Sequence, residues 1–86
     1  MYIIEIVQKE APYFCVGFMN KSSIEDGVLH YTSSRENALI VSDKETMDLA
    51  LKIISNNNKD RNKMYVMDWI TEVGNKKRIF ANDIIW

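Results

Sequence analysis

Residues 38–54, ALIVSDKETMDLALKII, carry the clearest folding signal in the chain: a short apolar run that leads into an amphipathic helix. Ser42 and Glu45 have the spacing of a capping box, in which two side chains satisfy N–H groups at a helix start. The pattern predicts a helix from about residue 43 to about residue 56, ended by asparagines that tolerate a left-handed backbone. Its apolar residues recur at helical spacing and are Met47, Leu49, Ala50, Leu51, Ile53 and Ile54.

The segments before this helix have the composition of β-strands. Residues 2–8 (YIIEIVQ) and 13–19 (YFCVGFM) are rich in β-branched and aromatic residues, and Pro12 lies between them. Residues 20–27 (NKSSIEDG) have turn composition, with a closing glycine. A short third strand is predicted at residues 28–32.

Two more strands are predicted after the helix. Residues 63–73 alternate between two faces, and residues 76–80 return after a possible hairpin turn at Gly74–Asn75. The fold class predicted is α+β, with a single antiparallel sheet of about five strands and one helix in the order β-β-β-α-β-β. We expect residues 1–86 to form one small domain.

Composition limits the class of protein. Of 86 residues, 47% are hydrophobic, which is typical of a globular chain. Cys15 is the only cysteine, so an intrachain disulfide is excluded and a reducing compartment is favoured. The N-terminal decapeptide has no basic region before its apolar run, and no stretch approaches 18 apolar residues. The expected location is therefore the cytoplasm, with no membrane span.

The predicted sheet has more apolar surface than one helix can cover. A helix is about 10 Å across and strands lie about 4.8 Å apart, so it covers two or three strands of one face. Apolar residues nevertheless occupy both faces of the first, second and fourth predicted strands. Either the sheet curls and leaves ordinary surface hydrophobics, or another protein molecule covers the second face.

A protein partner, or a second copy of the chain, is the explanation that we take as the leading hypothesis. The apolar ending DIIW, residues 83–86, adds some weight to it, although this segment could equally be a last strand within the fold. A tryptophan such as Trp86 is also more often a packing residue than a binding hot spot. The residues expected near such a partner surface are Trp69, Ile70 and Trp86.

Residues with catalytic potential are few. His30 and Cys15 fall on different predicted strands, and Cys15 is expected to be a small buried side chain. His30 lies close in sequence to Glu25 and Asp26, which permits an acid–base pair, but a half-exposed strand histidine is the simpler interpretation. No zinc, calcium or phosphate-binding motif is present in the sequence. We therefore predict no enzyme activity, no metal and no small-molecule cofactor.

The charges are unevenly distributed, and this gives an alternative function. Residues 1–58 carry five basic and eight acidic side chains, whereas residues 59–78 carry six basic and three acidic ones. A small nucleic-acid-binding module could use the basic set. The predicted hairpin separates its two clusters, however, so a solvated surface is the favoured interpretation. The six residues are Lys59, Arg61, Lys63, Lys76, Lys77 and Arg78.

The segments MYIIEIVQKEAPYFCVGFMN and YTSSRENALIVSDKETMDLALKII together resemble small uncharacterised early-region proteins of staphylococcal and related temperate phages. The resemblance covers about residues 1–55 and includes no catalytic signature. It implies only a context, because many small phage proteins bind and modulate a host protein. On that basis, the expected function is that of a non-catalytic accessory protein that forms a homodimer or binds a host protein.

Overall fold

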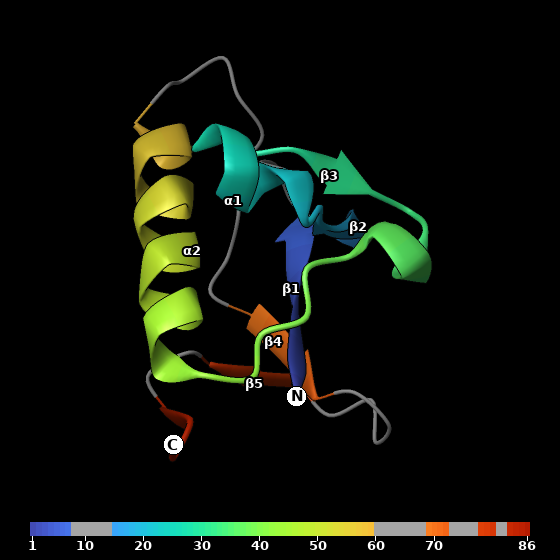
Figure 1. Cartoon of the computed structure of the whole chain (residues 1–86). Helices are drawn as coiled ribbons and strands as arrows, with labels where there is room; N and C mark the ends of the chain where they lie inside the picture. Colours follow the sequence, from blue (N-terminus) through green and yellow to red (C-terminus); the bar gives the residue numbers. More distant parts are fainter. Residues whose placement is uncertain (8–14, 60–68, 73–77, 81–82) are drawn as a thin grey trace.

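The chain has an α+β fold in a computed structural model that describes residues 1–7, 15–59, 69–72, 78–80 and 83–86 (Figure 1). The predicted α+β class, with an antiparallel sheet and a helix, is confirmed. The elements in chain order are β1 (Tyr2–Val7), β2 (Cys15–Met19), α1 (Ser22–Asp26), β3 (Tyr31–Thr32), the 3-10 helix η1 (Arg35–Asn37), α2 (Lys44–Asn58), β4 (Trp69–Glu72) and β5 (Arg78–Phe80).

Strand β1 is paired on both sides. Its C-terminal half pairs antiparallel with β2, where Glu5 lies opposite Phe18. Its N-terminal half pairs antiparallel with β4, where Ile4 lies opposite Ile70. Because β3 pairs with β2 and β5 pairs with β4, the hydrogen-bonded order is β3-β2-β1-β4-β5.

The segment before α2, residues 38–41, forms main-chain hydrogen bonds with the start of β1 and with the end of β2. The N–H of Val41 donates to the carbonyl oxygen of Tyr2 at 2.8 Å, and the N–H of Tyr2 donates to the oxygen of Val41 at 2.9 Å. The N–H of Leu39 donates to the oxygen of Met19 at 2.8 Å. Residues 38–41 thus connect the end of β2 with the start of β1, and Leu39 and Val41 are buried there.

Helix α2 starts one residue later than predicted, and the predicted capping box does not form. Asp43 is the N-cap: its carboxylate accepts from the Thr46 N–H at 2.9 Å and from the Thr46 hydroxyl at 2.8 Å. A charged carboxylate is a stronger acceptor than a serine hydroxyl, and its negative charge suits a helix N-terminus. The sequence pattern predicts Ser42 as the capping residue of α2, whereas the N-cap in the structure is Asp43, the next residue.

The two helices end in different ways. The prediction of a turn at residues 20–27 is wrong, because α1 occupies most of it; α1 ends at Gly27, which has a left-handed backbone with φ of 70°. The prediction of a left-handed asparagine after α2 is also wrong. Asn56, Asn57 and Asn58 belong to the helix, and the C-cap Lys59 is right-handed with φ of −72°. Asparagine permits a left-handed stop but does not impose one.

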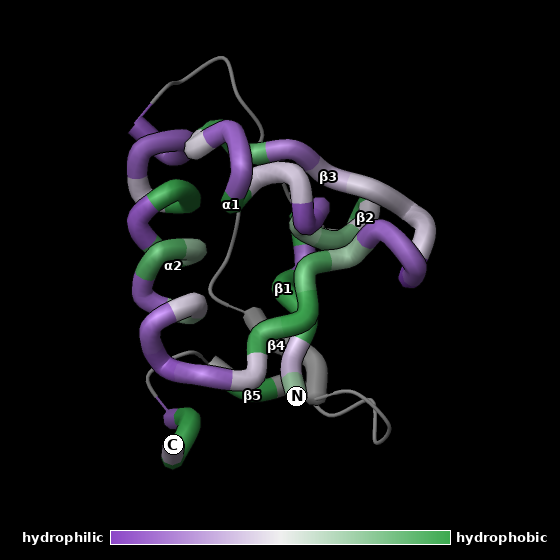
Figure 2. Tube along the Cα trace, viewed as in Figure 1, coloured by the Kyte–Doolittle hydropathy of each residue, from purple (hydrophilic) through white to green (hydrophobic). Residues whose placement is uncertain are grey.

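The main core lies between α2 and one face of the sheet. From α2 it contains Met47, Ala50, Ile53 and Ile54, as its spacing predicts, while Leu51 is half-buried and Leu49 exposed. Figure 2 shows the apolar positions of α2 on the side that faces the rest of the fold. The remaining buried members are Ile4, Ile6, Met19, Leu39 and Val41.

The opposite face of β1 is also buried within the chain itself. Ile3, Glu5 and Val7 alternate with the core residues Ile4 and Ile6, and they are 4%, 5% and 0% exposed. Of the two explanations that the sequence left open for the second face, β1 therefore fits the one that needs no neighbouring molecule. Helix size alone is a poor guide here because parts of the chain other than α2 also cover sheet surface.

Candidate functional site

The C-terminal segment lies beside the N-terminal end of β1, and both chain ends are at the same side of the molecule in Figure 1. Ile84 packs against the main core. The ring of Trp86 meets the ring of Tyr2 edge-on, with 5.7 Å between centroids and 74° between planes. Tyr2 is in turn held by its two main-chain hydrogen bonds to Val41. The last three residues are thus attached to the fold at Ile84 and at Trp86.

Ile85 projects into solvent between these two attached neighbours. Its side chain is 95% exposed, while the neighbouring Trp86 is 46% exposed and Met1 is 64% exposed. We call Met1, Tyr2, Ile85 and Trp86 the terminal patch. Burying an aliphatic side chain such as Ile85 would contribute about 1.5–3 kcal/mol. Because the flanking residues are already in contact with the fold, little extra ordering would oppose that burial.

Of the three residues predicted for a partner surface, the structure describes the side chain of Trp86 alone. Trp86 is half-exposed and lies in the terminal patch. Trp69 and Ile70 belong to β4, opposite Phe80 and Ile79 of β5, but their side chains lie outside the described part of the structure. Sequence reasoning missed Ile85 and Tyr2. The DIIW ending was a signal for Ile85, whereas the pairing of Tyr2 with Trp86 depends on the tertiary fold.

The six basic residues of the alternative function are not brought together among the described residues. Lys59 is exposed at the C-cap of α2, and Arg78 begins β5 opposite Thr71. The other four, Arg61, Lys63, Lys76 and Lys77, lie outside the described residues. Nucleic-acid binding therefore stays a prediction, with no described cluster of cations to support it.

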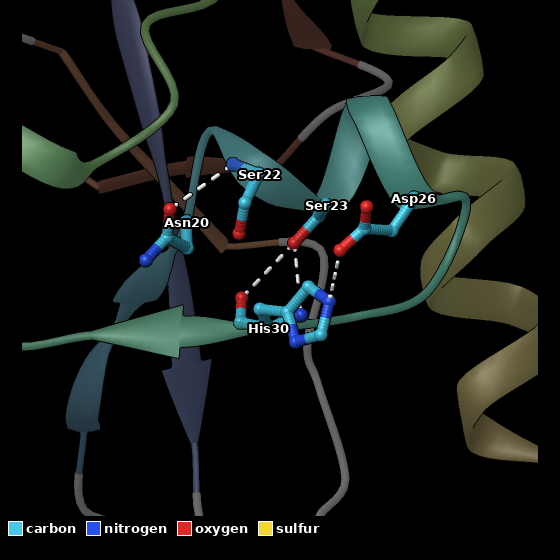
Figure 3. Close-up of polar contacts among 5 residues, drawn as sticks. All are labelled: Asn20, Ser22, Ser23, Asp26 and His30. Atoms are coloured by element: carbon cyan, nitrogen blue, oxygen red, sulfur yellow. Dashed lines mark hydrogen bonds and ion pairs between the residues drawn. The ribbon is translucent and has the colours of Figure 1, made fainter.

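Serine, histidine and aspartate do come together, at the junction of α1 and β3 (Figure 3). His30 Nε2 lies 2.9 Å from Asp26 Oδ2. Ser23 Oγ contacts the main chain of His30: it accepts from the N–H at 2.8 Å and donates to the carbonyl oxygen at 3.1 Å. A nucleophilic serine would instead need the imidazole as its base.

The burial of Ser23 is a second difference between this cluster and a site with a nucleophilic serine. Ser23 is 0% exposed, so its hydroxyl does not face solvent. Asn20 strengthens the same junction, because its N–H donates to the His30 oxygen at 2.9 Å and its side chain accepts from the Ser22 N–H at 3.0 Å. The cluster therefore connects α1, through hydrogen bonds, to the main chain of His30, directly before β3. Its sequence signal was present in SSIED and His30, but the sequence did not specify which atoms pair.

The expectation of a buried Cys15 is wrong. Cys15 is exposed at the start of β2, and its thiol lies 3.2 Å from the carbonyl oxygen of Gly17. The register of β1 and β2 shifts here: Ile6 lies opposite Gly17 and Val7 opposite Cys15, so Val16 is an extra residue. The prediction of burial placed Cys15 in the middle of an apolar strand covered on both faces, whereas Cys15 is the first residue of β2 and lies beside this bulge.

Among the described residues, no group of three or more histidine, cysteine, aspartate or glutamate residues could hold a metal ion. In that same part of the chain, no helix has the length and apolar character needed to cross a membrane. Comparisons with known protein families, with curated proteins and with solved structures found no match.

Proposed function

We propose that this chain is a non-catalytic protein-binding module that uses the terminal patch, either to self-associate or to bind another protein. The observation that carries the proposal is the exposure of Ile85 between two neighbours that are already packed on the fold. Exposed aliphatic and aromatic side chains in one place are typical of surfaces that bind protein.

The chemistry of the patch favours a protein surface as the ligand. Isoleucine, methionine and tryptophan side chains offer apolar contact area, and an aromatic ring with a fixed orientation is a common anchor in interfaces. A stable interface buries about 800 Å² on each partner. Four residues are too few for that area, so the patch would be the centre of a wider contact whose rim includes polar neighbours such as Asp83, which is exposed.

The biological context forms a second part of the proposal. The resemblance of residues 1–55 to phage early-region proteins supports an accessory protein that acts in the cytoplasm of a host cell. The pairings of β4 with β1 and with β5 support a sheet of five strands as the scaffold that holds the patch. In this proposal the scaffold positions Tyr2, and Tyr2 positions Trp86.

Association of the chain with itself or with another protein can be measured directly. Sedimentation velocity across a wide concentration range would report self-association, and affinity capture from host lysate would report a partner. We expect either a mass that rises to a dimer or one retained host protein. A strict monomer that retains no lysate protein above the level of an unrelated control bait would overturn the proposal.

A further inference from the structure

We draw no further inference here: the strongest candidate, the hollow of about 140 Å³ between the loop after α1 and the C-terminal end of α2, is lined by a mixture of apolar side chains and asparagine amides, and nothing in the described part of the structure shows what covers it.

Discussion

The ring of Trp86 lies edge-on against the ring of Tyr2, 5.7 Å away, so the last residue of the chain is attached to the first strand. Edge-to-face aromatic pairs are worth about 0.5–1.5 kcal/mol beyond the area that they bury. The contact therefore has consequences both for stability and for the presentation of Ile85.

Replacement of Trp86 tests the contact with Tyr2. Trp86→Ala should lower the free energy of unfolding by about 1 kcal/mol, because the edge-on aromatic contact is lost. Trp86→Phe keeps an aromatic ring and should recover most of that loss. Urea unfolding followed by far-UV circular dichroism measures both variants. Equal stability of Trp86→Ala and the wild type would show that the contact does not hold the segment in solution.

Ser23 is predicted to matter more for stability than its neighbour Ser22. Ser23→Ala removes two hydrogen bonds to the His30 main chain in a fully buried place, at a cost of about 1–3 kcal/mol. Ser22→Ala is the matched control, because the hydrogen bond that Ser22 makes to Asn20 uses its main-chain N–H. That control should change stability by less than about 0.5 kcal/mol. Similar losses for the two variants would contradict a specific role for the Ser23 hydroxyl.

Gly17 is predicted to be required by the close approach of β3. A Cβ at this position would lie 2.7 Å from the carbonyl oxygen of Thr32, so Gly17→Ala must displace backbone, at a cost of about 1–3 kcal/mol. Amide hydrogen exchange should accelerate at Phe18 and Thr32, which lie opposite each other.

Gly27→Ala is the control for that experiment. A Cβ there would meet no heavy atom within 4 Å, but the φ of +70° is strained for alanine by about 1–2 kcal/mol. Its effect on hydrogen exchange should be confined to the end of α1. Faster exchange at Thr32 in both variants, or in neither, would contradict the proposed contact.

Asp43 should make the stability of the protein depend on pH under acidic conditions. The Thr46 N–H, and then the Thr46 hydroxyl, donate hydrogen bonds that lower the pKa of Asp43 below its usual value. Because the folded pKa is the lower one, the stabilisation is present above the usual aspartate pKa of about 3.9 and is lost as pH falls through the lowered value.

Asp43→Asn tests this dependence, because asparagine still caps a helix but does not titrate. The wild type should exceed Asp43→Asn in thermal midpoint at neutral pH, and the difference should shrink as the pH falls below about 4. Asp48→Asn, which removes an exposed carboxylate 3.9 Å from Lys44, controls for the loss of one surface charge. A difference that stays constant from pH 7 to pH 2 would contradict the role of Asp43.

The sequence predicted the elements that depend on local patterns. The spacing of Met47, Ala50, Ile53 and Ile54 identified α2 and its buried side, because a helix repeats every 3.6 residues wherever it packs. Early strands were also found from their β-branched residues. The cap was misplaced by one residue because Ser42 and Asp43 are both good caps, and only the geometry of Thr46 distinguishes them.

Features that depend on tertiary contacts could not be predicted. Cys15 is exposed at the start of β2, beside a register shift between β1 and β2, and the apolar pattern of that strand shows neither feature. Ile3 and Val7 are buried on the face of β1 opposite the main core, and the size of α2 does not determine that burial. For the candidate site, Trp86 was named from composition, but the position of Ile85 required the contacts of Ile84 and Trp86.

The most direct test of the terminal patch compares two exposed aliphatic residues. Ile85→Ser removes the projecting side chain of the patch, and Leu49→Ser removes a side chain that is 45% exposed on α2. The dissociation constant of the dimer or partner complex is measured for both variants by sedimentation or calorimetry. Ile85→Ser should weaken binding at least tenfold, equivalent to about 1.4 kcal/mol, while Leu49→Ser leaves it unchanged. Wild-type affinity in Ile85→Ser would contradict the assignment of the patch.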